Sequence, residues 1–361
     1  MSSCRFLVVN GVVSRTSDVP PVSHFLENHP GAYTTTRTHT NASYLLFWER
    51  HLRRLAESAR ILYESRPELL FASLVTRVPS SLSLSLWEPT IRSLVNNSLT
   101  EVLPIALEER NYGEELAVTA LVGGNYTKLN EEDGRDEEER IFSLLDVYVH
   151  VSIYVPPAFG VRTNAAQLAV VGRGRDVAKA KFSDWVRLRK CLDKLRSPWA
   201  TEVLLSNDGD RILEGCVTNF FVVCRSESKD GTRKDLLDHK SFCSFEVQTA
   251  PVNDGLLPGI IRQLVLEICS SKGIPFREVA PSWSERELWE EAFVTNSLRL
   301  VQHVEAIRVP SSWELLESKT WEELSWEEKR FKEGPGIITA EIQGEIVERA
   351  GFEGRPVSNF V

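Results

Sequence analysis

The chain has 361 residues, of which 42% are hydrophobic and 26% charged, and this is typical of a folded globular protein with room for two domains. Its formal net charge of −9 argues against a nucleic-acid-binding face, and no apolar run approaches the roughly 18 residues of a membrane helix. The six cysteines include no CxxC pair, and no signal or transit segment is visible, so we expect a cytoplasmic protein without a metal site or a disulfide framework.

Two β-hairpins are predicted near the N-terminus. Asn10-Gly11 is a strong turn signal, so residues 5–13 are expected to pair as two short strands. Residues 31–38 are β-branched and aromatic, and a turn at Asn41-Ala42-Ser43 connects them to residues 44–47. The sequence therefore begins with strands rather than with a helix.

An amphipathic helix is predicted to follow these strands. Apolar residues recur at helical spacing, at Trp48, Leu52, Leu55, Ala59 and Leu62. We expect His51, Arg54 and Ser58 to lie together on a neighbouring face of the same helix.

The middle of the chain contains the predicted domain boundary. Residues 67–120 indicate one or two helices, and residues 116–122 and 147–154 indicate strands. Pro156-Pro157 ends the last of these strands, so we expect domains at 1–156 and 157–361. The acidic run at residues 130–140 is most simply a solvated loop without a role.

Two lysines precede a predicted helix in the second domain. A strand at residues 167–171 is followed by a Gly-Arg-Gly-Arg sequence that lacks the third glycine of a dinucleotide fingerprint. Lys179 and Lys181 come next, and apolar residues at near-helical spacing follow at Trp185, Leu188, Leu192 and Leu195. On position alone, both lysines would be surface residues.

Glu214 lies in the most apolar part of the second domain. It follows the turn signal at residues 207–210 and precedes a predicted buried strand at residues 220–223. A carboxylate is costly to bury unless a partner compensates its charge. Glu214 is therefore either a paired buried residue or a strand-end residue that faces solvent. A long polar insertion at about residues 225–245 follows, and a capping-box pattern predicts a helix over residues 284–291.

The segment TEVLLSNDGDRILEGCVTNFFVV, residues 201–223, resembles the signature of the fold-type IV (class IV) pyridoxal-phosphate enzymes. This family contains branched-chain aminotransferases, D-amino acid aminotransferases and aminodeoxychorismate lyases. The resemblance implies a two-domain α+β or α/β fold, with a smaller N-terminal α/β domain and a larger C-terminal β-barrel-like domain with flanking helices. It also implies pyridoxal 5'-phosphate as cofactor and transfer of an amino group between an amino acid and a 2-oxo acid.

The resemblance assigns roles to particular residues. Glu214 would pair with the pyridine nitrogen of the cofactor. Lys181 would bind the cofactor covalently, since it lies 33 residues before Glu214 (214 − 181) and 21 before Glu202 (202 − 181); Lys179 is the alternative. Arg54, in an H-x-x-R-L motif, would bind the phosphate, and the alternative is a solvated basic helix face. The backbone N–H groups of Ile260 and Ile261 at a helix start, and the hydroxyl of Ser297, would complete the phosphate site.

Two positions depart from the family pattern. Ile261 stands where the family usually has Thr, and Thr34 stands where many members have Glu. We expect Thr34 to affect substrate choice more than cofactor binding. His150 would line a substrate pocket or be structural, and whether His150 or Arg37 binds the substrate carboxylate stays open.

Three functional interpretations follow from the sequence. The first is a pyridoxal-phosphate aminotransferase, the second a related lyase acting on aminodeoxychorismate, and the third a homologue that binds the cofactor without turnover. The resemblance implies a homodimer whose active site at the domain junction is completed by the partner chain. The sequence does not fix the substrate or its stereochemistry.

Overall fold

The computed structural model describes residues 4–14, 19–71, 84–128, 137–225, 245–314 and 316–361. Most of the acidic run at residues 130–140 and of the insertion at residues 225–245 therefore lies outside the described residues. The chain forms two compact units that divide in sequence between Pro156 and Pro157. The first unit comprises residues 1–156, 179–190 and 349–361, and the second comprises residues 157–178 and 191–348. The first unit is thus built from three separate segments.

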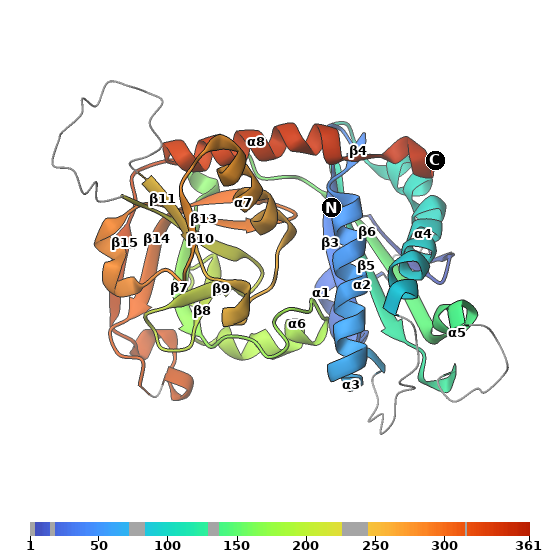
Figure 1. Ribbon diagram of the computed structural model, residues 1–361, viewed down its shortest axis with the longest axis horizontal. Coiled ribbons are helices and arrows are strands. Elements are labelled where there is room, and N and C mark those ends of the chain that lie inside the picture. The colour runs from blue at the N-terminus through green and yellow to red at the C-terminus, as the bar shows by residue number, and fades with distance from the viewer. Residues whose placement is uncertain (1–3, 15–18, 72–83, 129–136, 226–244, 315) are drawn as a thin grey trace. The chain divides into compact units, whose positions relative to one another are not determined.

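The described part of the first unit contains a seven-stranded antiparallel sheet in the order β16-β4-β3-β5-β6-β1-β2. Strands β3, β4, β5 and β6 of this sheet are labelled in Figure 1. The strands are β1 (Arg5–Val9), β2 (Val12–Ser14), β3 (Ala32–His39), β4 (Tyr44–Leu45), β5 (Glu115–Gly124), β6 (Leu145–Tyr154) and β16 (Arg355–Pro356). The helices are α1 (Val22–Asn28), α2 (Trp48–Ser65), α3 (Glu68–Phe71), α4 (Trp87–Glu109), α5 (Glu137–Leu144) and α6 (Asp184–Leu188). The predicted hairpins at the N-terminus and the helix beginning at Trp48 are confirmed.

Alternation along β3 separates the two faces of this sheet. Successive strand residues point to opposite faces. Thr34 points toward α2, which runs along β3 in Figure 1, whereas Tyr33 packs with Phe25 of α1 and Val186 of α6. Helix α2 follows its apolar stripe, with Leu52, Leu55, Ala59 and Leu62 fully buried. The sheet therefore presents one face to the helix that carries Arg54 and the other to α1 and α6.

The last residues of the chain cover one edge of the sheet. β16 pairs with β4, and the N–H of Val357 donates to the carbonyl of Ser43 over 2.9 Å. Phe360 is fully buried in the first unit. The C-terminal segment is thus an integral part of this unit.

The second unit is a closed barrel with additional strands. Strands β10, β13, β14, β7, β8 and β9 pair in that order, and β9 pairs back with β10. The strands are β7 (Ala166–Gly172), β8 (Glu202–Ser206), β9 (Ile212–Gly215), β10 (Asn219–Arg225), β11 (Phe245–Thr249), β12 (Phe276–Glu278), β13 (Trp289–Asn296), β14 (Leu300–Pro310) and β15 (Trp326–Arg330). The main helices are α7 (Ile260–Lys272) and α8 (Ile337–Glu353). The residues of α8 from Arg349 onward belong to the first unit. The barrel-like domain that the sequence predicts is confirmed.

Short 3-10 helices connect many of these elements. They span Leu84–Leu86, Tyr126–Lys128, Arg162–Asn164, Arg189–Leu192, Val252–Asp254, Trp283–Leu288, Leu316–Ser318, Trp321–Glu323 and Val357–Phe360. The helix predicted over residues 284–291 forms only as a 3-10 helix at Trp283–Leu288, and its predicted end is wrong because β13 begins at Trp289. Trp289 is buried and pairs with Cys224 of β10, so strand pairing outweighs the local capping signal.

Candidate active site

Lys181 is held between β3 and α2 in the first unit. The N–H of Tyr33 donates to the carbonyl of Lys181 over 2.9 Å, and the N–H of Lys181 donates to the hydroxyl of Ser58 over 3.1 Å. The Nζ atom of Lys181 lies 4.5 Å from the centroid of the Tyr33 ring. Lys181 is half-buried, whereas Lys179 is exposed. The structure thus distinguishes two lysines that the sequence leaves in competition.

The three arginines at the start of α2 have different environments. Arg50 forms an ion pair of 2.7 Å with Glu353, and Arg53 is exposed. Arg54 is half-buried, and its Nη2 donates to Oγ1 of Thr34 over 2.9 Å. Its enclosed Nε has no hydrogen-bond partner among the described residues, and burial lowers the pKa of Arg54 to about 10. A buried cation with an unpaired donor is suited to an anionic ligand.

His51 is fully buried beside this arginine. Its Nδ1 lies 2.7 Å from Oγ1 of Thr34, and its Nε2 has no partner in the described part of the chain. Burial, followed by the charges of Arg54 and Lys181, holds the pKa of His51 well below its usual range. His51 is therefore neutral, and Arg54 supplies a positive charge beside it.

Glu214 is buried in the second unit, with 3% of its side chain exposed. Its Oε1 accepts from Nε of Arg175 over 2.9 Å, and the Arg175 side chain is 5% exposed. Its Oε2 accepts from the N–H of Leu257 over 3.0 Å and from Nδ2 of Asn219 over 3.4 Å. Of the two interpretations of this residue, the solvent-facing one is therefore wrong.

Helix α7 begins close to these residues. Its N-cap is Gly259, and no side chain caps its first N–H groups, which belong to Ile260 and Ile261. An added Cβ at Gly259 would lie 2.0 Å from Oδ1 of Asn219, so glycine permits this approach of the helix to β10. Uncapped N–H groups at a helix N-terminus suit a phosphate.

Ser297 follows β13 in a turn with a defined shape. Oδ1 of Asn296 accepts from the N–H groups of the two residues after Ser297, over 3.1 and 2.8 Å. Nη2 of Arg299 pairs with Oε2 of Glu202 over 2.9 Å, and Oε1 of Glu202 accepts from the hydroxyl of Thr218 over 2.8 Å. The turn with Ser297 is thus tied to the loop between β9, which carries Glu214, and β10.

Comparison with known families adds to this geometry. The sequence profile of the family described as Amino-transferase class IV matches residues 31–307, which is more than half of the 361 residues. The chain belongs to this family. It is a pyridoxal-phosphate-dependent aminotransferase that acts on an amino acid and a 2-oxo acid.

Solved structures of aminotransferases share the fold of this class IV aminotransferase. The branched-chain aminotransferase of Thermoproteus uzoniensis, solved with norvaline, has a TM-score of 0.60 and 17% identity over 98% of this chain and 99% of the other. The Escherichia coli branched-chain aminotransferase has a TM-score of 0.57 and 17% identity over 95% and 93%. The fold IV-transaminase of Curtobacterium pusillum has a TM-score of 0.56 and 15% identity over 97% and 99%. The comparison with curated protein sequences finds no match.

Two residues considered for the substrate carboxylate have internal partners in this aminotransferase. Nε2 of His150 lies 3.0 Å from the carbonyl of Pro20, and its ring stacks on Phe25 at 5.8 Å between centroids. Burial lowers the pKa of His150. Arg37 is 5% exposed and donates to the carbonyl of Thr38 over 3.0 Å. These contacts favour a structural role for His150.

Sequence reasoning missed Arg175 and the partners of Arg54. One indirect indication of Arg175 is present in the sequence: a buried carboxylate at Glu214 requires a cation or several hydrogen-bond donors nearby. The sequence did not indicate which arginine would supply it. Thr34 was noted as a departure, but its contact with Arg54 depends on how β3 packs against α2.

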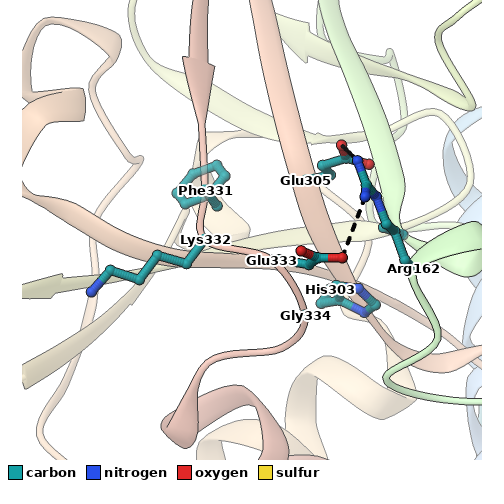
Figure 2. A pocket seen from close by; sticks show the side chains of 8 residues that line it. Arg162, His303, Glu305, Phe331, Lys332, Glu333 and Gly334 are labelled. Atoms are coloured by element: carbon teal, nitrogen blue, oxygen red, sulfur yellow. Dashed lines mark hydrogen bonds and ion pairs between the residues drawn. The ribbon is translucent and has the colours of Figure 1, made fainter.

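A separate pocket of about 140 Å³ lies in the second unit, shown in Figure 2. Arg162 forms an ion pair with Glu333 over 3.3 Å, and Lys332 points away from this pair. None of the residues expected to contact the cofactor lines this pocket. The described residues also contain no group of three His, Cys, Asp or Glu side chains suited to a metal ion, and none of their helices has the length and apolarity needed to cross a membrane.

Proposed function

We propose that this aminotransferase binds its cofactor covalently through Lys181. The observation that carries this assignment is the different setting of the two lysines. The backbone of Lys181 is hydrogen-bonded on both sides, to β3 and to α2, and its amine lies over the Tyr33 ring, whereas Lys179 is exposed. A fixed backbone limits where the amine can go, which is what a positioned nucleophile requires.

We propose that Arg54, Ser297 and the N–H groups of Ile260 and Ile261 bind the cofactor phosphate. Arg54 has an enclosed Nε without a partner in the described residues, so a phosphate oxygen would satisfy it. The first N–H groups of α7 lack intrahelical acceptors and lie at the positive end of the helix dipole. Each of these groups supplies donors and no negative charge.

Glu214 is proposed to accept a hydrogen bond from the protonated ring nitrogen of the cofactor. Its position is fixed by Arg175, Leu257 and Asn219, so the carboxylate is oriented before the cofactor arrives. When bound, the cofactor supplies an electron sink for negative charge at the substrate Cα. Glu214 would keep the ring nitrogen protonated, and the Lys181 amine would take the Cα proton and return it.

We further propose branched-chain or related amino acids as substrates and a homodimer as the active form. The substrate proposal is supported by the branched-chain aminotransferases among the relatives. Incubating the protein with L- and D-amino acids and either 2-oxoglutarate or pyruvate, followed by mass spectrometry, tests the substrate proposal.

For the homodimer, light scattering should give twice the 40.8 kDa chain mass, and an active monomer would contradict the dimer. A cytoplasmic location is consistent with the described cysteines, all of which are thiols.

The decisive experiment for the cofactor site is borohydride reduction followed by peptide mapping. We expect the reduced cofactor on the peptide that contains Lys181. Lys181→Ala should bind the cofactor reversibly and lose turnover, and the matched variant Lys179→Ala should retain both covalent attachment and turnover. If the reduced cofactor is found on Lys179, the covalent attachment must be reassigned to that residue. Cofactor found on neither lysine would refute the proposal.

A further inference from the structure

Thr34 contacts two side chains of α2, Arg54 and His51. Its side chain is fully buried on β3, and its Oγ1 lies 2.9 Å from Nη2 of Arg54 and 2.7 Å from Nδ1 of His51. The same helix face reaches the Lys181 backbone through Ser58. One hydroxyl thus joins a cation expected to bind phosphate to a neutral imidazole.

The direction of these hydrogen bonds follows from the chemistry of the groups. A guanidinium only donates, so the Thr34 oxygen accepts from Arg54. The Thr34 hydroxyl proton then has one acceptor of suitable geometry among the described residues, Nδ1 of His51. If the hydroxyl donates to Nδ1, the proton of the neutral imidazole lies on Nε2. In this arrangement Arg54 donates a hydrogen bond to Thr34, and Thr34 donates one to Nδ1 of His51.

The charge at position 34 matters as much as the geometry. No described carboxylate forms an ion pair with Arg54, and threonine is neutral. A carboxylate at this position would bring a negative charge near the guanidinium and offset part of its positive charge. With threonine at position 34, the hydrogen bond orients Nη2 of Arg54, and the guanidinium keeps its full positive charge to attract a ligand.

We propose that Thr34 is a positioning residue that orients Arg54 toward the cofactor phosphate without neutralising it, and that it fixes His51 as the Nε2–H tautomer. This inference rests on the proposed function, because it takes Arg54 as a phosphate ligand. It assigns Thr34 to cofactor binding, whereas its place in the family pattern suggested substrate choice.

The first test needs neither a variant at position 34 nor bound cofactor. The full chain labelled with ¹⁵N-histidine is examined by NMR at neutral pH, and His51→Asn identifies the signals of His51. We expect a protonated Nε2 and an unprotonated Nδ1. A proton on Nδ1, or a charged ring, overturns the inference.

The second test measures cofactor affinity in a set of variants at equal salt and pH. Thr34→Val should weaken pyridoxal phosphate binding about 10-fold or more, since a hydrogen bond to a charged group is lost. Thr34→Ser should bind within about 3-fold of the wild type, because the hydroxyl is kept. The matched control is Thr36→Val: Thr36 is equally buried on the same strand, but its hydroxyl donates to the carbonyl of Leu46. We expect this control to keep wild-type affinity.

The outcomes separate this inference from the function on which it rests. If Arg54→Ala weakens binding while Thr34→Val behaves like Thr36→Val, the role of Thr34 is refuted and that of Arg54 stands. If Arg54→Ala leaves cofactor affinity unchanged, the phosphate role of Arg54 fails as well. Should Thr34→Val not fold, the serine variant and the wild-type NMR signals still decide the question.

Discussion

Replacing Arg175 with Met is expected to destabilise the second unit by about 3–5 kcal/mol. The change removes one partner of a buried ion pair and takes the Arg175 charge away from the Glu214 carboxylate. The N–H of Leu257 and Nδ2 of Asn219 would still donate to Glu214. They satisfy hydrogen bonds but do not balance the charge.

The geometry of the pair supports this magnitude. The contact between Nε and Oε1 is 2.9 Å, and the two side chains are 5% and 3% exposed. With charge centres about 4 Å apart and an effective dielectric constant of about 20, the attraction is roughly 4 kcal/mol. For a domain of this size, a loss of about 3–5 kcal/mol lowers Tm by roughly 6–20 °C.

The assay is a double-mutant cycle followed by calorimetry on cofactor-free protein. Arg175→Met and Glu214→Gln are measured alone and together, and bound cofactor is excluded because it would shift Tm by mass action. We expect the double variant to lose less stability than the two single losses combined. Arg196→Met is the control, because its pair with Asp193 spans 3.8 Å and is 47% and 65% exposed.

Additive losses in this cycle would refute the reasoning, since independent side chains cannot form a compensating pair. A Tm for Arg175→Met as high as that for Arg196→Met would refute it too. Either result would mean that the other donors to Glu214 suffice to hold a buried carboxylate.

Three further predictions follow from the two units. Arg54→Ala should weaken pyridoxal phosphate binding by about 1.5–3 kcal/mol in a fluorescence titration, whereas Arg53→Ala should not, and equal affinities would exclude Arg54 from the site. Gly259→Ala should also weaken cofactor binding, because the added Cβ would lie 2.0 Å from Oδ1 of Asn219 in β10. Gly344→Ala is the control and should bind the cofactor normally, because Gly344 has open space around it. Equal cofactor affinities of the two variants would contradict this prediction. The prediction for His51→Asn concerns pH: because the pKa of His51 is lowered in the folded state, below about pH 6.5 the unfolded chain binds a proton that the folded chain does not. The stability of the wild type should therefore fall on acidification by up to roughly 1.4 kcal/mol per pH unit more than that of the variant. Parallel stability profiles of the two proteins would contradict this.

Local features of the fold were predictable from the sequence, because they depend on neighbouring residues. The shared face of His51, Arg54 and Ser58 follows from the helical period alone, and all three meet β3 or the Lys181 segment in the structure. The turn at Asn10-Gly11 is a two-residue signal. The cofactor and the enzyme class came from the family resemblance, which the profile match confirms.

Features that depend on tertiary pairing were not predictable in the same way. The approach of Arg175 to Glu214 requires β7, β8 and β9 to be neighbours in the barrel. The helix predicted over residues 284–291 ends at Leu288 because Trp289 pairs with β10, and a capping pattern carries no information about that partner. The direction of the Thr34 hydroxyl toward Arg54 likewise depends on packing between a strand and a helix.

The pairing of β16 with β4 also sets the order in which the first unit can be completed during synthesis. When residues 1–156 have left the ribosome, neither the Lys181 segment nor residues 355–356 has yet been made. Domains generally fold as they emerge, N-terminal first, but here the unit that is started first is finished last. Until β16 arrives, β4 is an open sheet edge, and open edges are places where strands of other chains add. A truncated chain that stops before residue 349 therefore leaves the β4 edge of this sheet without the pairing that β16 supplies.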